Sequence, residues 1–417
     1  MTKALIVGGG PAGMVAAIAA AEEGASVTLL ERNEKLGKKL YITGKGRCNI
    51  TNDCDRETFF ASIPRNPRFL FSAYSRFTPQ DLMNAMQRLG VPMTVERGNR
   101  VFPASQKASD VTRALAQRMQ QLGVEVRLNT RVSSLDLREG RVCGVMDEEG
   151  TLYPADCVVI ATGGLAYPLT GSTGDGYELA RQAGHRITPT YPSLISLEAY
   201  DPWIPSLQGL SLKNVKLTAR LGKKTLYSGL GEMMFTHYGI TGPLVLTLSA
   251  LLPEEGIRDV AVRLDLKPGL TEDQLKRRIQ REFDAHAGRQ LAGALAELLP
   301  RRLLEAVLSA AGLSPELSIH HLSRQQRESL LASLKALPIR LKARRGFDEA
   351  VITRGGVDVR EVDPKTMQSR KAEGLYFAGE VLDVDGFTGG FNLQIAFSTG
   401  HSAGKALKPC ANDPAPV

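Results

Sequence analysis

The sequence contains few cysteines, and no two of them have C-x-x-C spacing. The five are scattered and odd in number, which is typical of reduced thiols in a cytoplasmic protein: Cys48, Cys54, Cys143, Cys157 and Cys410. The absence of the dithiol spacing argues against a dithiol reductase and against a zinc ribbon. We therefore expect neither a disulfide framework nor a metal site.

Long apolar runs are also absent. No stretch reaches the roughly 18 residues that a transmembrane helix needs, so we expect no membrane partner. The apolar segments 4–7 and 14–21 are separated by glycines and followed by Glu22 and Glu23, which is not the pattern of a signal peptide. The 417 residues are 43% hydrophobic and 23% charged, a composition typical of a soluble enzyme with two or three domains. We expect a cytoplasmic enzyme.

A glycine-rich motif follows the first predicted strand, residues 3–7. It has the form Gly8-x-Gly10-x-x-Gly13 and opens a predicted helix. In this motif the first glycine permits a tight turn, the second lets the backbone approach a pyrophosphate, and the third allows close packing. A second predicted strand, residues 27–30, ends at Glu31, whose carboxylate is placed to accept hydrogen bonds from a ribose. The pattern predicts a dinucleotide site.

The far end of the chain favours FAD over NAD. A predicted strand at 374–378 runs into Gly379-Glu380, and a helix begins at Gly390-Phe391-Asn392-Leu393. Its N-terminus is placed to stabilise negative charge on a flavin. The sequence Ala161-Thr162-Gly163 ends another predicted strand, as in glutathione-reductase-like flavoproteins. Because these elements occur in the order of that class, we predict FAD as the cofactor.

Composition changes after about residue 189. Short apolar runs alternate with Gly, Pro and Ser over residues 194–266, which indicates a β-rich insert. Residues 271–337 have helical periodicity instead. We predict a FAD-binding domain at 1–189 and 350–417, a β-rich domain at 190–269 and 338–349, and a helical domain at 270–337.

Six motifs together resemble one family, the BaiN-like bacterial flavoproteins. They occupy residues 43–52, 161–168, 235–243, 353–357, 379–380 and 389–392. The resemblance implies an α/β fold with a Rossmann-type, glutathione-reductase-like FAD-binding domain, interrupted by a β-barrel-like domain and a helical domain. Activities known or proposed in this family are NAD(P)H-dependent reduction of steroid-like enones and oxidation of aminoacetone.

The predicted FAD contacts combine these motifs. The resemblance implies that the glycine-rich loop after the second strand lines the FAD, and that Val132 makes main-chain contacts to adenine. The complete predicted set is Gly8, Gly10, Pro11, Ala12, Gly13, Glu31, Arg32, Lys39, Thr43, Gly44, Gly46, Arg47, Asn49, Val132, Ala161, Thr162, Gly163, Asp175, Gly379, Glu380, Gly390, Phe391, Asn392 and Leu393.

Three residues are candidates for catalysis. Tyr167, after the Ala-Thr-Gly-Gly turn, is placed to protonate a carbon after hydride delivery. His237 is either an acid–base group or a structural residue of the insert. Arg354 is a candidate for binding a substrate carboxylate or carbonyl. Cys48 has no partner thiol, so we interpret it as a packed small residue.

Three functions are compatible with the sequence. The favoured one is NAD(P)H-driven reduction of a C=C bond conjugated to a carbonyl in a small molecule. NAD(P)H would bind transiently, because no second G-x-G-x-x-G follows a strand. The alternatives are an amine oxidase using O₂ and an RNA-binding or tRNA-modifying flavoprotein.

The RNA alternative depends on residues 271–345, which contain 14 Lys and Arg against 8 Asp and Glu. Phe283 is the only aromatic residue among these basic residues. We therefore favour a solvated helical face over a nucleic-acid surface. The sequence indicates no oligomeric state.

Overall fold

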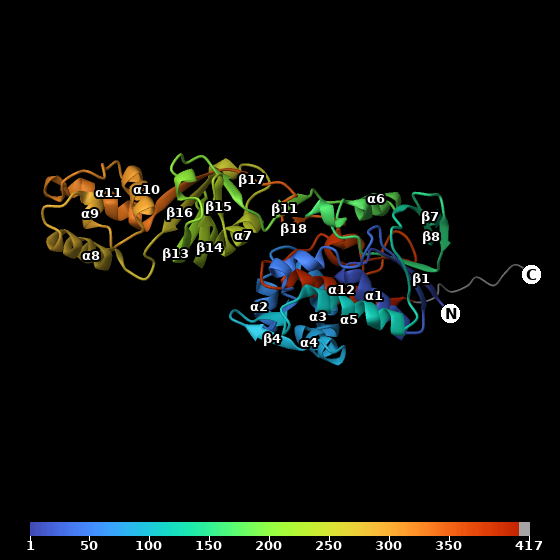
Figure 1. The fold of residues 1–417 in the computed structure, drawn as a ribbon. Coiled ribbons are helices and arrows are strands. Elements are labelled where there is room, and N and C mark those ends of the chain that lie inside the picture. The colour runs from blue at the N-terminus through green and yellow to red at the C-terminus, as the bar shows by residue number, and fades with distance from the viewer. Residues whose placement is uncertain (408–417) are drawn as a thin grey trace, which may run out of the picture. The chain divides into compact units, whose positions relative to one another are not determined.

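The computed structural model describes residues 1–407; residues 408–417, which include Cys410, lie outside this description. The chain divides into two compact units. Unit 1 comprises Met1–Ser193 and the chain from Phe347 onward, and unit 2 comprises Leu194–Gly346. Their elements are labelled in Figure 1.

A parallel five-stranded sheet forms the centre of unit 1. Its order is β19-β10-β1-β2-β6. Every residue of β1 after Lys3 is buried, which is the pattern of a strand covered on both faces. The strands are β1 (Lys3–Val7), β2 (Ser26–Leu30), β6 (Glu125–Arg127), β10 (Cys157–Ile160) and β19 (Leu375–Phe377).

Helices α1 (Pro11–Glu22), α5 (Ala108–Gln121) and α12 (Phe391–Ala406) lie together beside this sheet (Figure 1). The approach of α12 to α1 depends on small residues. A Cβ on Gly400 would lie 2.3 Å from the carbonyl oxygen of Ala12. The N-termini of α1 and α12 both belong to predicted FAD motifs, so this helix pair positions the candidate site.

Smaller elements complete unit 1. Strands β7 (Val132–Arg138), β8 (Arg141–Asp147) and β9 (Leu152–Pro154) form an antiparallel sheet next to β10. A second small sheet has the order β3-β5-β4, and β11 (Tyr191–Ser193) pairs with β18 (Ile352–Arg354). The remaining elements are β3 (Thr51–Asn52), β4 (Met93–Glu96), β5 (Arg100–Pro103), α2 (Arg56–Ala61), α3 (Phe71–Arg76), α4 (Pro79–Arg88), α6 (Asp175–Gln182), η1 (Leu40–Gly46), η2 (Pro67–Leu70), η3 (Pro168–Thr170), η7 (Val359–Glu361) and η8 (Gly379–Val381).

Unit 2 contains a closed barrel with the order β12-β15-β14-β13-β16-β17. Buried and exposed residues alternate along β16, as expected of a strand with one face on the core. The strands are β12 (Leu197–Ala199), β13 (Ser211–Leu221), β14 (Lys224–Phe235), β15 (Gly239–Thr241), β16 (Val260–Asp265) and β17 (Leu337–Arg344).

The helices of unit 2 share one apolar core with the barrel, to which Phe235 and Leu304 both belong. Capping boxes start two of them, at Thr271 and at Ser323. The elements are α7 (Pro243–Leu251), α8 (Glu272–Ala285), α9 (Leu291–Ala294), α10 (Arg301–Ala310), α11 (Arg324–Lys335), η4 (Pro205–Leu207), η5 (Ile257–Asp259) and η6 (Ile319–His321).

The predicted fold class is confirmed: a Rossmann-type α/β domain is interrupted by a closed barrel and by helices. The three predicted domain ranges stay a prediction, because the structure divides the chain only into units 1 and 2. Within residues 1–407, none of the helices is both long enough and apolar enough to span a membrane.

Candidate functional site

The glycine-rich turn between β1 and α1 is tightly packed except at one position. Gly8 has a φ of +108°, and a Cβ there would lie 2.5 Å from the carbonyl oxygen of Ala161. A Cβ on Gly13 would lie 1.9 Å from the carbonyl oxygen of Gly8. In contrast, a Cβ on Gly10 would meet no atom within 4 Å. Gly10 therefore keeps a space clear in front of α1.

The two helices whose N-termini belong to predicted FAD motifs, α1 and α12, both lack a side-chain cap. The N-cap of α1 is Gly10, followed by Pro11 and the buried Ala12, and the N-cap of α12 is Gly390, followed by the buried Phe391. The first N–H groups of a helix have no partner within it, and they carry partial positive charge. Both termini therefore suit an anionic ligand.

Glu31 ends β2 and is buried, with 6% of its surface exposed. Its Oε2 accepts a hydrogen bond from the Gly9 N–H at 2.7 Å. Its Oε1 accepts from the backbone N–H and the side-chain amide of Asn33, both at 2.7 Å. A carboxylate has about four lone-pair sites, so one remains for a ribose hydroxyl.

Asp175 links the predicted residue Arg32 to Arg131, the residue before the predicted Val132. Its carboxylate pairs with Arg32 at 2.8 Å and accepts two hydrogen bonds from Arg131 at 3.0 Å. Burial opposes ionisation of Asp175, but the hydrogen bonds from Arg131 and the charge of Arg32 outweigh burial and lower its pKa. Val132 follows Arg131 in the sequence, begins β7 and is buried.

Glu380 joins distant segments of unit 1. Its Oε2 lies 2.7 Å from Nζ of Lys39, and its Oε1 accepts from the Thr353 N–H at 2.8 Å. The N–H of the preceding Gly379 donates to the Thr399 hydroxyl of α12 at 2.9 Å. The structure thus brings Lys39, Gly379 and Glu380 together beside α12.

Asn49 and Asn392 fix the start of α12. With its amide oriented to satisfy its neighbours, Asn49 accepts from the Gly390 N–H at 3.1 Å. Asn392 accepts from the Gly386 N–H at 2.8 Å and donates to the carbonyl of Gly386 at 2.7 Å. Leu393 follows and is half-buried.

The loop that contains Asn49 turns sharply. Gly44 and Gly46 have φ values of +57° and +86°. The Thr43 hydroxyl donates to the carbonyl of Leu40 at 2.7 Å. A Cβ on Gly44 would lie 3.1 Å from the backbone N of Asn49, so the glycine permits this close return.

Arg47 has protein partners in this loop. It forms an ion pair with Glu96, hydrogen-bonds Gln106, and lies over the ring of Phe102 at 4.1 Å. These contacts hold the loop against β4 and β5. The positive charge of Arg47, one of the predicted FAD contacts, is therefore paired with Glu96.

Cys48 is fully buried, as expected for a packed small residue. Burial raises the pKa of its thiol to about 12, although a hydrogen bond with Thr43 acts against the shift. The thiol is therefore protonated and unreactive at neutral pH.

The turn after β10 contains Ala161, Thr162 and Gly163. The Ala161 N–H donates to the carbonyl of Val7 at 2.8 Å, and Gly163 has a φ of +76°. The Thr162 hydroxyl is buried without a hydrogen-bond partner among residues 1–407. A Cβ on Gly176 would lie 2.2 Å from this hydroxyl, so α6 approaches the turn closely.

Two of the three catalytic candidates lie in unit 1. The Thr353 hydroxyl accepts from the N–H of Ala166 at 3.1 Å, which links the residue before Tyr167 to the residue before Arg354. Tyr167 has a φ of 55° and is half-buried. His237 belongs to unit 2, where it is exposed and meets the Tyr238 ring edge-on at 4.8 Å.

Sequence reasoning missed a buried pair of carboxyls between η8 and α12. Both oxygens of Asp385 are buried without a hydrogen-bond partner among the described residues, and Nε of Arg65 lies 3.8 Å from one of them. Burial raises the pKa of Asp385 to about 7, although Arg65 and Arg354 act against the shift. Burial also raises the pKa of Asp383. The available signal was the presence of two acids in the largely apolar stretch 381–385.

This fold and this arrangement of glycine turns, helix N-termini and a strand-end carboxylate define a Rossmann-type dinucleotide-binding protein. Residues 2–406 match the family described as the HI0933-like protein Rossmann domain, and the chain belongs to it. The chain is an FAD-dependent oxidoreductase, as the sequence predicted.

Two curated relatives match over nearly their whole length. The chain is 34% identical over 411 residues to the 3-dehydro-bile acid delta(4,6)-reductase of Clostridium scindens, covering 97% of this chain and 99% of that protein. It is 32% identical over 408 residues to the ribosomal RNA dihydrouridine synthase of Escherichia coli, covering 97% of each.

A solved structure supports the fold alone. The 3-ketosteroid delta1-dehydrogenase of Sterolibacterium denitrificans has a TM-score of 0.53 and 15% identity, with 97% of this chain and 98% of that chain covered.

Proposed function

We propose that unit 1 binds FAD through the predicted residues, and that the chain reduces a C=C bond conjugated to a carbonyl with NAD(P)H as electron donor. The observation that carries the proposal is the open space at Gly10 before the uncapped α1, in the same unit as buried Glu31 and the uncapped α12. These features suit a pyrophosphate, a ribose and an anionic ring edge.

The names of the two relatives support the same bond chemistry. A 3-dehydro-bile acid carries a carbonyl at C3, which is conjugated to double bonds at positions 4 and 6. Dihydrouridine is uridine with its C5=C6 bond saturated, and that bond is conjugated to the C4 carbonyl. Both names therefore describe a conjugated carbonyl compound and its reduction or reduced product.

FAD held by these residues would supply a hydride, and the β carbon of the substrate would accept it. The α carbon then requires a proton, for which Tyr167 is our first candidate and His237 our second. We assign Arg354 the role of binding the carbonyl oxygen of the substrate, where negative charge develops. The balance is one hydride and one proton added to the C=C bond, with NAD(P)H oxidised.

An anaerobic titration tests the proposal. The flavin absorbance near 450 nm should bleach on addition of NADH or NADPH and should recover on addition of a conjugated enone. Tyr167→Phe should leave bleaching by NAD(P)H unchanged and slow recovery at least tenfold. A protein that binds no FAD would refute the proposal. Bleaching by an amine, with peroxide formed in air, would favour the oxidase alternative.

One observation favours RNA as the substrate that contains the C=C bond to be reduced. The helices of unit 2 present exposed basic residues, namely Lys276, Arg277, Arg281, Arg301, Arg302, Arg324 and Arg327. Charge reversal at Arg277 and Arg281 should weaken binding of a single-stranded RNA and reduce its salt dependence. Unchanged RNA binding in this variant would remove the support for this candidate.

A further inference from the structure

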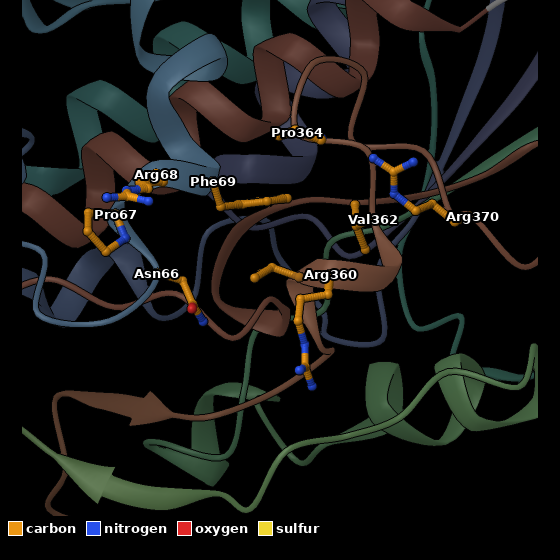
Figure 2. A pocket seen from close by; sticks show the side chains of 9 residues that line it. Asn66, Pro67, Arg68, Phe69, Arg360, Val362, Pro364 and Arg370 are labelled. Carbon is orange, nitrogen blue, oxygen red and sulfur yellow. The ribbon is translucent and has the colours of Figure 1, made fainter.

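A cavity of about 550 Å³ opens on unit 1, and its lining includes none of the residues that carry the proposed function. Its lining contains no acidic residue and consists of Asn66, Pro67, Arg68, Phe69, Val359, Arg360, Val362, Pro364 and Arg370. Figure 2 shows Phe69 and Val362 between Arg68 on one side and Arg370 on the other, with Arg360 nearby. Three arginines thus line the cavity beside these apolar residues.

The charge around the cavity is positive. The Asp358 carboxylate accepts three hydrogen bonds from the Arg360 guanidinium, and it also lies 4.0 Å from Arg186. Oδ2 of Asp363 lies 3.4 Å from Nη2 of Arg370, which is longer than a usual charge-assisted hydrogen bond.

Arg68 is exposed and has no ion-pair partner within the part of the chain that the structure describes. Of the three arginines in the lining, Arg68 therefore keeps a charge that no carboxylate among the described residues neutralises, whereas Arg360 and Arg370 have carboxylate partners.

Hydrogen bonds hold the walls of the cavity in place. The Asn66 amide donates to the carbonyl of Asp383 at 2.6 Å, so the η2 wall is attached to the segment before α12. The Arg370 N–H donates to the carbonyl of Glu361 at 2.9 Å, which joins the two ends of the other wall. A cavity with fixed walls can select its ligand without a large ordering cost.

We propose that this cavity binds a phosphate-bearing ligand of nucleotide size. Guanidinium groups bind phosphate oxygens through charge-assisted, often bidentate hydrogen bonds. The volume is in the usual range for small-ligand sites. The phosphate is carried either by a free nucleotide or by an RNA strand.

The test measures binding and requires no turnover. With FAD at saturating concentration, fluorescence anisotropy follows a labelled twelve-residue oligouridylate, and calorimetry follows ADP. The probe variant is R68Q/R370Q. The matched control is R88Q/R113Q, which removes the same charge from exposed arginines of α4 and α5 that do not line the cavity; Arg113 pairs with Asp110 as Arg370 pairs with Asp363.

We expect the probe variant to weaken binding at least tenfold and the control to change it less than threefold. If the strand is the ligand, the slope of log affinity against log salt should fall by about 1.4 for two lost contacts. Tight binding of ADP with no such salt dependence would instead identify a free nucleotide.

Equal weakening in both variants, or no binding of either probe by the wild type, would overturn the proposal. Bound FAD and the melting temperature of each variant report whether it is folded. Because neither readout uses the reductase reaction, failure of this proposal is distinguishable from failure of the proposed function.

Discussion

Replacing Asp385 with asparagine should change how the stability of the protein depends on pH. Asp385 is 2% exposed, and burial raises its pKa to about 7. An unfolded aspartate titrates near 3.9, so the folded state holds the proton across about three pH units. As the pH rises from about 4 to 7, the unfolded state loses this proton first, and the wild type loses roughly 4 kcal/mol of stability.

Asparagine carries no charge at any of these pH values, so D385N should not show this loss. Between pH 4.5 and 7.5 the variant should gain roughly 3 kcal/mol relative to the wild type. Equilibrium urea unfolding of the FAD-free protein, followed by circular dichroism at several pH values, measures the difference. The matched control is D358N. Asp358 is also buried, but a hydrogen bond from Arg360 lowers its pKa, so its variant should be destabilised by a constant amount over this range.

A difference between D385N and the wild type that does not change with pH would refute the reasoning. A difference of the opposite sign would mean that Arg65 keeps Asp385 ionised in the folded state.

Further predictions concern the candidate FAD site. Gly13→Ala should lower stability by roughly 3 kcal/mol, because its Cβ would lie 1.9 Å from a backbone oxygen; Gly10→Ala should keep the melting temperature of the FAD-free protein but weaken FAD binding more than tenfold. Gly269→Ala, which meets open space in unit 2, should change neither quantity, and equal effects of the three variants would contradict the assignment. Glu31→Gln should weaken FAD binding at least tenfold in a fluorescence titration, and unchanged affinity would exclude its role at the ribose. Cys48→Ser should leave the number of rapidly reacting thiols at pH 8 unchanged, because the pKa of the Cys48 thiol is about 12; a lost reactive thiol would be inconsistent with its burial.

The local parts of the fold were predictable because their signals lie within short stretches. The strand at residues 3–7, the glycine turn and the helix after it were read from about 30 residues, and the structure contains them as β1, the Gly8–Gly13 turn and α1. The start of α4 has a local signal of the same kind, because Thr78 forms a capping box with Asp81 there.

The contacts that assemble the site could not be read in the same way. Lys39 and Glu380 are 341 positions apart, and only the packing of the sheet and α12 brings them to 2.7 Å. Arg47 carries the same charge whether its partner is FAD or Glu96. The residue type alone therefore does not identify the partner. The apolar neighbours of Asp385 indicate burial, but no local pattern shows that its carboxyl lacks a hydrogen-bond partner.

The antiparallel pair of β11 and β18 has a consequence for the history and engineering of the chain. The segment 194–346 leaves unit 1 after Ser193 and returns before Ile352, and these two residues are partners in one ladder. Its entry and exit are therefore adjacent in space, so the segment has the connectivity of a module inserted into a turn. A chain in which a short hairpin loop joins residue 193 to residue 352 would keep the register of this ribbon. Such a deletion, or exchange of the module between relatives, would separate what each unit contributes to binding.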